Sequence, residues 1–307
     1  MNVLTNLNVS SFYKNGASVV RVEGLQNFDI GKIFDCGQCF RFDAVEKSSH
    51  QKEFSGVACG RFVSFAQDEN TLYIYGSTQD EYETVWKRFL AIDQDYSAID
   101  EEILASYNSL ALERAVNYGN GIRILEQDGF ETVISFIISQ NNNIPRIKKI
   151  IEALCARCGE PIFLSEEMKG HLSGKSSLCT FPTPKALYEL GEQGLFDLKT
   201  GFRAKYIYDA VCRILDGRLD LSLIENEEDT DRAIEYLSTV KGIGRKVASC
   251  ALLFGFAKYD AFPIDVWMKR VGEKYFPEQK ELSGKYFGRY AGIAQQYLFY
   301  YERYNNG

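Results

Sequence analysis

Apolar and polar residues alternate along the first quarter of the chain. Residues 56–65 and 71–76 repeat with the two-residue period of a sheet that buries one face, which predicts antiparallel strands. From Asp80 onward the apolar residues recur every three or four positions, as in amphipathic helices. Three segments fit this spacing: residues 81–90, 131–139 and 147–154.

The pattern predicts an α+β fold, with a strand-rich antiparallel N-terminal lobe on a mostly helical, two-lobed body. We place a β-rich domain at residues 1–120 and a helical domain with a helix-hairpin-helix motif at residues 121–307. A chain of 307 residues with 45% apolar content can bury such a core. Residues 165–180 are rich in Gly and Ser and are predicted to form an insertion loop. We expect the active site in the cleft between the helical lobes.

The segment from Val240 to Ala248 indicates a hairpin between two helices. Its glycines, Gly242 and Gly244, allow left-handed turns and close approach of another chain. Amides at a helix start point outward and bind anions such as phosphate. Lys241 adds a cation to this turn, so we predict that Lys241, Gly242 and Gly244 contact a DNA backbone.

An amine and an acid follow this hairpin. Lys246 lies just inside the second helix, Cys250 lies one turn further along it, and Asp265 stands at a predicted helix start. Each has a simpler interpretation: a solvated lysine, a core cysteine and an N-cap. Their occurrence together and in this order favours a catalytic pair on one rigid scaffold.

These residues resemble the helix-hairpin-helix-Gly-Pro-Asp superfamily of DNA glycosylases, and within it the 8-oxoguanine DNA glycosylases. There the hairpin is followed by a catalytic lysine and by Pro-[Val/Ile]-Asp, which correspond here to Lys246 and Pro263-Ile264-Asp265. The hairpin departs at Val240-Lys241-Gly242, where the family has Leu-Pro-Gly. Five separated motifs match in the family's order, from about Val19 to Phe299.

The resemblance implies a pocket for the damaged base. Gly37, in Gly-Gln-Cys-Phe-Arg, would accept through its carbonyl the N7 hydrogen that distinguishes 8-oxoguanine from guanine. Gln295 would read the Watson–Crick edge and Phe299 would stack on the base. Cys250 completes the expected lining.

It also implies contacts to DNA around the flipped base. Asn141, in Asn-Asn-Asn-Ile-Pro-Arg-Ile, would enter the gap in the duplex, and Arg146 belongs to the same segment. Phe202 and Arg203 match a wedge that holds the orphaned partner. The chain departs at Phe196, where the family has an arginine that grips cytosine, which puts cytosine discrimination in doubt.

A second departure is Trp267, where the family has a histidine two residues after the catalytic aspartate. A tryptophan can stack or pack but offers no imidazolium to a phosphate.

The implied reaction joins base flipping to covalent catalysis. A base inside a duplex must rotate into a pocket before it can react. The neutral amine of Lys246 would attack C1′ of the deoxyribose, and the resulting Schiff base permits β-elimination of the 3′ phosphate. Asp265 would stabilise the positive charge that develops on the sugar.

Two other functions remain open at this point. One is a related glycosylase for alkylated purines or oxidised pyrimidines, which Gly37, Gln295 and Phe299 disfavour. The other is a DNA-binding module that holds phosphate without chemistry, in which Lys246 and Asp265 would have no task.

The net charge of −7 argues mildly against nucleic acid, but charge is unevenly distributed. Residues 241–290 hold ten Lys or Arg against five Asp or Glu, a local charge of +5, whereas residues 225–235 are acidic. We therefore expect binding to damaged double-stranded DNA with a steep salt dependence.

We predict no metal and no cofactor. Cys36-x-x-Cys39 and Cys155-x-x-Cys158 have zinc-type spacing, but the first pair lies in the predicted lesion-recognition segment and Cys155 takes an apolar helix position. Only two histidines are present, which disfavours a histidine-rich site.

We also expect a monomer without a membrane partner. There is no run of about eighteen apolar residues, and the first residues lack a secretory pattern. The expected location is the cytoplasm (nucleoid) of a prokaryote or the nucleus of a eukaryote.

Overall fold

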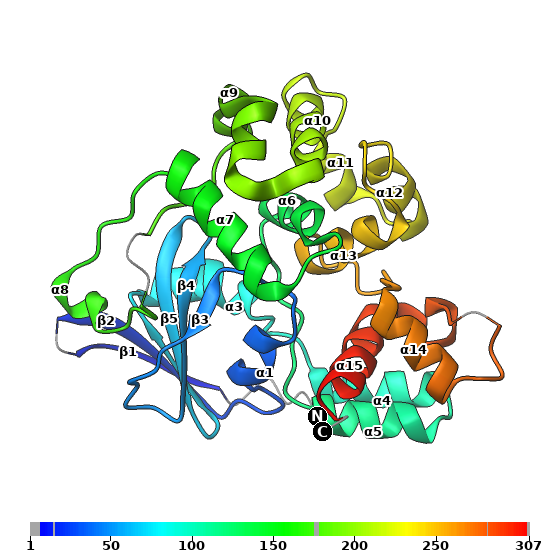
Figure 1. Cartoon of the computed structure of the whole chain (residues 1–307). Helices are drawn as coiled ribbons and strands as arrows, with labels where there is room; N and C mark the ends of the chain where they lie inside the picture. Colours follow the sequence, from blue (N-terminus) through cyan, green and yellow to red (C-terminus); the bar gives the residue numbers. More distant parts are fainter. Residues whose placement is uncertain (1–6, 15, 175–177, 281, 306–307) are drawn as a thin grey trace.

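An antiparallel sheet forms one lobe of the protein, and helices form the rest (Figure 1). The computed structural model describes residues 7–14, 16–174, 178–280 and 282–305. The strands are β1 (Asn8–Lys14), β2 (Ala17–Glu23), β3 (Phe42–Ala44), β4 (Lys52–Ala58), β5 (Arg61–Asp68) and β6 (Thr71–Tyr75). They are ordered β1-β2-β6-β5-β4-β3, and every pair is antiparallel, which confirms the predicted fold class.

The first predicted strand run is in fact a hairpin. Residues 56–65 span the end of β4 and the start of β5, and Cys59 and Gly60 form the two-residue turn between them. Both turn residues have positive φ, 51° and 74°, which matches the twist of a tight hairpin. The alternation of apolar and polar residues continues through a two-residue turn, so the sequence pattern alone does not reveal the turn.

One face of the sheet packs against α1 (Ile30–Asp35) and the short helices that follow β6. Aromatic rings fill this core: Phe34, Phe42, Phe65, Trp86 and Phe89 lie in mutual contact. The short helices are α2 (Gln79–Glu81), η2 (Tyr82–Trp86) and α3 (Lys87–Phe89).

The other face of the sheet is covered by a segment that we call the strap, residues 160–174 and 178–180. It contains α8 (Glu166–Lys169), and Pro161 bridges Cys179 in antiparallel fashion. Met168 packs with Phe62 and Tyr75 of the sheet. The predicted insertion loop at residues 165–180 therefore acts, over its described part, as a cover for apolar side chains.

The helical body is built on amphipathic helices that begin at conventional caps. Side chains that accept a backbone N–H at these helix starts include Asp95, Ser109, Asp128, Asn143, Thr183, Asp229 and Asp265. The longer helices are α4 (Tyr96–Ser106), α5 (Leu110–Gly119), α6 (Gly129–Ser139), α7 (Ile144–Cys158), α9 (Pro184–Leu195), α10 (Ala204–Leu215), α12 (Thr230–Leu237), α13 (Arg245–Gly255), α14 (Val266–Tyr275) and α15 (Ala291–Tyr304). The shorter helical segments are η3 (Phe196–Thr200), η4 (Gly201–Arg203), α11 (Leu221–Asn226), η5 (Gly284–Tyr286) and η6 (Gly288–Tyr290).

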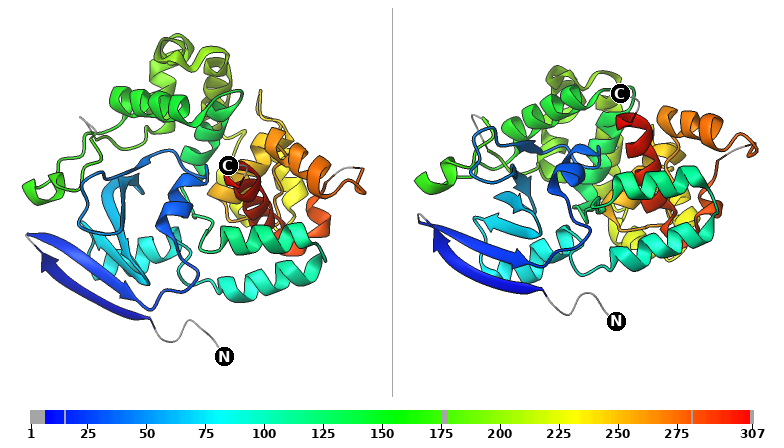
Figure 2. Two further views of the ribbon diagram at one scale, coloured as in Figure 1. Left: turned by 60° about the horizontal axis from the view of Figure 1, so that its bottom comes forward. Right: turned by 90° about the horizontal axis from the view of Figure 1, so that it is seen from below.

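Helices distant in sequence share one core. Figures 1 and 2 show α4 and α5 beside α15, and Tyr297 of α15 donates a hydrogen bond of 2.8 Å to buried Asp100 of α4. The packing therefore crosses the predicted domain boundary at residue 120. Within the described residues, no helix has the length and apolarity needed to cross a membrane.

Candidate active site

The hairpin between α12 and α13 is anchored by the buried side chains of Val240 and Ile243. Gly242 between them has φ +82°, and a Cβ atom there would lie 2.4 Å from the ring of Tyr206. Only glycine avoids both the left-handed strain and this collision. Gly244 has extended backbone and open space around it, and no side chain caps the amides at the start of α13.

A cavity of about 710 Å³ opens where five parts of the chain meet. They are the starts of α13 and α14, the turn between α6 and α7, the C-terminal half of α15, and the loop after α1. The cavity lies within the size range of small-molecule sites, roughly 300–1,000 Å³.

Lys246 and Asp265, the predicted catalytic pair, both line this cavity. Lys246 is half-buried in the first turn of α13, with Nζ 5.8 Å from the ring centroid of Phe136. Asp265 is the N-cap of α14, and its Oδ1 accepts N–H bonds of 2.9 Å from Trp267 and Met268. The second oxygen, Oδ2, has no partner among the described residues, so it is available to a ligand.

Cys250 lies buried one turn after Lys246 and is not among the residues that line the cavity. Burial raises the pKa of its thiol, while the nearby Lys246 amine opposes this and Asp265 adds to it. The thiol is therefore protonated at neutral pH. Cys250 lies behind the cavity wall close to Lys246 and Asp265, and it does not line the cavity, contrary to the prediction from the sequence.

Gly37 and Phe299, predicted to bind the base, line the cavity from two different elements. Gly37 has φ +81°, a conformation that favours glycine. Gln295, one turn before Phe299 on α15, is only 4% exposed, and its Oε1 is buried without a hydrogen-bond partner in the described structure. Gln295 is not among the residues that line the cavity. Buried acceptors are normally satisfied, so its unpaired oxygen lacks the donor that a ligand would supply.

The three asparagines of the α6–α7 turn have separate tasks. Asn143 caps α7 by accepting the Arg146 N–H at 3.0 Å, and Asn142 donates to the Ile138 carbonyl at 3.2 Å. Asn141 is exposed, has φ +46° and lines the cavity. It is therefore the asparagine whose side chain is presented to solvent.

Arg203 differs from the sequence prediction. Its side chain is only 3% exposed, and the guanidinium donates to the carbonyls of Thr200, Gln140 and Asn141. In this conformation it stabilises the turn that presents Asn141 and is not available to grip an orphaned base. The buried contact arises from tertiary packing between η4 and the α6–α7 turn, which no local pattern encodes.

The other predicted DNA contacts are exposed. Phe202 is 47% exposed with its ring 4.5 Å from the guanidinium carbon of Arg203. Arg146 is exposed near Arg203, whose pKa is lowered by burial and by this neighbouring charge. Lys241 is also exposed, and its backbone amide donates to Asp209.

Several residues that line the cavity were not predicted from the sequence. Phe136, Lys269 and Arg303 line the cavity together with Trp267. Arg303 could have been predicted from its position four residues after Phe299, because residues at this spacing lie on one face of a helix. Phe196, the departure from the family pattern, is 55% exposed on the α9 side of the protein.

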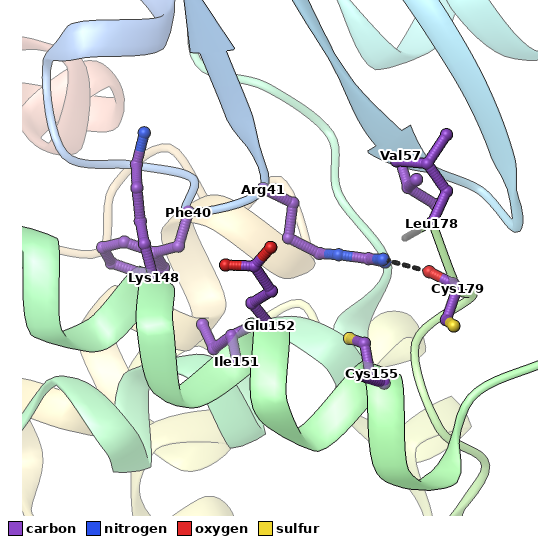
Figure 3. A pocket seen from close by; sticks show the side chains of 10 residues that line it. Phe40, Arg41, Val57, Lys148, Ile151, Glu152, Cys155, Leu178 and Cys179 are labelled. Carbon is purple, nitrogen blue, oxygen red and sulfur yellow. Dashed lines mark hydrogen bonds between the residues drawn. The ribbon is translucent and has the colours of Figure 1, made fainter. Parts of the chain in front are cut away.

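A separate, much smaller cavity of about 30 Å³ lies between α7, the sheet and the strap (Figure 3). There Arg41 donates to the Cys179 carbonyl and contacts Glu131, with Cys155 nearby. Burial raises the pKa of Glu131 to about 7, and Arg41 opposes that shift. Such a space holds about one water molecule, so we assign it no ligand.

The paired cysteines lie in structural positions. Cys36 and Cys39 are buried, and burial raises the pKa of each thiol to about 12. Within the described parts of the chain, no three His, Cys, Asp or Glu residues gather closely enough to hold a metal ion.

Family models match almost the whole span of the two lobes. Residues 22–133 match the N-terminal domain of 8-oxoguanine DNA glycosylase, and residues 134–285 match the HhH-GPD superfamily of base excision DNA repair proteins. A probable N-glycosylase/DNA lyase of Methanothermobacter thermautotrophicus is 32% identical over 219 residues, which cover 62% of this chain and 67% of that protein.

Solved structures give the same result. The apo 8-oxoguanine glycosylase/lyase of Clostridium acetobutylicum is 35% identical with a TM-score of 0.84, over 95% of this chain and 98% of that one. A structure of MBOgg1 in complex with a low-affinity DNA ligand is 34% identical with a TM-score of 0.87, over 99% and 100%.

Proposed function

Because the chain belongs to the 8-oxoguanine DNA glycosylases of the HhH-GPD superfamily, we propose that it excises 8-oxoguanine from duplex DNA and then cleaves the abasic site. It is a bifunctional glycosylase and lyase of base excision repair. The observation that carries this proposal is the presence of Lys246 and Asp265 on one cavity.

The cavity receives the damaged nucleotide after it leaves the duplex. Extrusion costs a few kcal/mol of stacking and pairing, and contacts in the pocket offset this. In this proposal Asn141 and Phe202 fill the vacated space, and the exposure of both side chains supports this assignment. Phe299 supplies a stacking surface, and the unpartnered oxygen of Gln295 supports an acceptor role toward the Watson–Crick edge.

The two catalytic groups divide the chemistry between them. The lone pair of the Lys246 Nζ forms a bond to C1′ as the glycosidic bond breaks, and the electron pair of that bond leaves with the base. The carboxylate of Asp265 stabilises the positive charge on the sugar while this happens. Because the amine stays attached, ring opening yields a Schiff base.

β-Elimination completes the reaction. Loss of a C2′ proton from the Schiff base expels the 3′ phosphate, which cleaves the strand, and hydrolysis of the Schiff base frees Lys246. The covalent intermediate is what separates this mechanism from simple hydrolysis by water.

Borohydride trapping tests the assignment. We expect the wild-type protein to form a covalent adduct with an 8-oxoguanine duplex, and Lys246→Gln to form none because it lacks the nucleophile. Asp265→Asn should retain binding and release the base at least about 100-fold more slowly, since a preorganised electrostatic group is removed. Adduct formation by Lys246→Gln would place the nucleophile elsewhere.

The partner is damaged double-stranded DNA. We propose that the protein binds it as a monomer, in the nucleoid of a prokaryotic cell or in a eukaryotic nucleus. Sedimentation of the free protein and of its DNA complex tests the stoichiometry, and a 2:1 complex would contradict it.

A further inference from the structure

An arginine without an assigned role lines the catalytic cavity. Gln295, Phe299 and Arg303 are spaced four apart on α15 and therefore form one stripe along the helix. The stripe begins at the buried Gln295 and ends at the half-buried Arg303, with Phe299 and Arg303 both on the cavity wall.

The guanidinium of Arg303 has a defined place. Its central carbon lies 5.8 Å from the ring centroid of Phe299 and 5.1 Å from that of Tyr304. A Cβ atom on Gly37 would lie 3.8 Å from Arg303 Nη1, so the guanidinium sits beside the Gly37 backbone. The Tyr304 hydroxyl donates to the Asp35 carbonyl at 2.9 Å, which holds the end of α15 against the end of α1.

Arg303 has no ion pair and no hydrogen bond to any described residue. Its neighbour Glu302 is buried and is engaged by Lys274 and Tyr275 of α14. A guanidinium carries five N–H donors in a fixed fork and accepts nothing. Those donors face a cavity that takes a ligand, so an acceptor on that ligand is their natural partner.

We propose that Arg303 is a specificity-determining residue that donates to a ring carbonyl of the everted 8-oxoguanine. This rests on the function proposed above. 8-Oxoguanine has carbonyls at C6 and C8, one on each side of N7–H. If the Gly37 carbonyl accepts the N7 hydrogen, a donor beside Gly37 is next to one of these two oxygens.

Phosphate is the other acceptor that the substrate offers. Two other cations of the cavity, Arg245 and Lys269, are exposed at the starts of α13 and α14 and suit the backbone of the DNA better. Arg303 lies instead between Phe299 and Gly37, the two residues proposed to contact the base itself. Its position therefore favours the base edge.

Two assays separate contact with the base from contact with the backbone. One measures single-turnover release of 8-oxoguanine from a duplex, and the other measures β-elimination on a duplex with a preformed abasic site. Arg303→Met keeps an apolar chain over Phe299 but removes the donors, and Arg303→Lys restores one cation. Arg114→Met, on the exposed side of α5, is the matched control.

We expect Arg303→Met to slow base release about 10- to 100-fold, the effect of losing a charged hydrogen bond, and Arg303→Lys to be intermediate. Cleavage of the preformed abasic site should stay within about twofold of wild type, because no base is present there. Arg114→Met should match wild type in both assays.

Equal losses in both assays would assign Arg303 to the phosphate backbone and overturn the proposal. So would unchanged base release by Arg303→Met. Failure of the wild-type protein to release 8-oxoguanine would instead refute the proposed function, and this inference with it. An unchanged melting temperature of Arg303→Met and Arg303→Lys checks that the fold is retained.

Discussion

Glycine is required at position 242 for two independent reasons. Its φ of +82° is strained for any L side chain, and the ring of Tyr206 occupies the place of a Cβ atom. We expect Gly242→Ala to lower the free energy of unfolding by about 3 kcal/mol, because left-handed strain and a steric collision add. Denaturant titration measures this.

Gly244→Ala is the matched control for that prediction. The backbone there is extended and a Cβ atom would meet nothing within 4 Å. The cost should be about 1 kcal/mol or less, that of replacing a glycine N-cap. Equal destabilisation by the two variants would contradict our account of the hairpin.

The sequence allowed several site residues to be predicted. Lys246 and Asp265 followed from their order after the hairpin, Gly37 and Phe299 from the resemblance to the family's motifs, and all four line one cavity. Arg203 could not be predicted, because its buried contacts with the Gln140 and Asn141 carbonyls depend on two segments about sixty residues apart. A free and a buried arginine look the same in sequence.

At the scale of elements, the strap illustrates the same limit. Its Gly and Ser content predicts a loop, yet Ile162, Leu164 and Leu172 pack with Met168 on the outer face of the sheet. The Gly and Ser content of a segment indicates only its local conformational freedom. Whether the segment packs on a sheet depends on strands that are far away in the sequence. The irregular apolar spacing here matches neither a helix nor a strand, so only the fold reveals it.

A polar cluster fastens the strap to the sheet. His171 of the strap lies 2.5 Å from Glu53 of β4 through Nδ1 and stacks on Tyr75, with ring centroids 4.1 Å apart. Ser64 and Ser48 also donate to the Glu53 carboxylate, which is 3% exposed. Burial alone would raise the pKa of Glu53, but these hydrogen bonds outweigh it and the net shift is downward.

We expect Glu53→Gln to lower the free energy of unfolding at pH 7 by about 1–3 kcal/mol, since buried partners lose a charged acceptor. The folded pKa of Glu53 lies below its unfolded value, so the stabilisation is present above the unfolded pKa. It is lost as pH falls through the lower, folded value. Urea unfolding of both proteins at pH 7 and near pH 3 measures the difference.

The exposed Glu46, close to the same strand in sequence, is the control. Glu46→Gln should match wild type at both pH values. A gap between wild type and Glu53→Gln that persists unchanged at low pH would show that the carboxylate charge is not what fastens the strap.

At the scale of the whole molecule, the placement of charged side chains differs from what the net charge suggests. The chain carries a net charge of −7, yet Arg245 and Lys269 line the cavity at the start of α13. The cavity at the other end of α13 is lined by Glu126, Asp128 and Glu225. Basic side chains therefore lie at the start of α13, where we propose that DNA binds, and net charge alone does not predict this placement.

This polarity predicts how affinity responds to salt. Removing one cation that binds a phosphate should reduce the slope of log K against log salt by about 1, because fewer counterions are released. Lys241 is exposed on the hairpin before α13, and we expect Lys241→Gln to lower the slope by about that amount. Lys87→Gln, on α3 beside the acidic cavity, removes the same charge from the other side and should leave the slope unchanged. Fluorescence anisotropy on one duplex from about 50 to 200 mM salt compares them. Equal changes in slope for the two variants would mean that affinity follows net charge and not the placement of the hairpin, since both variants remove one positive charge and only their positions relative to the DNA should distinguish them.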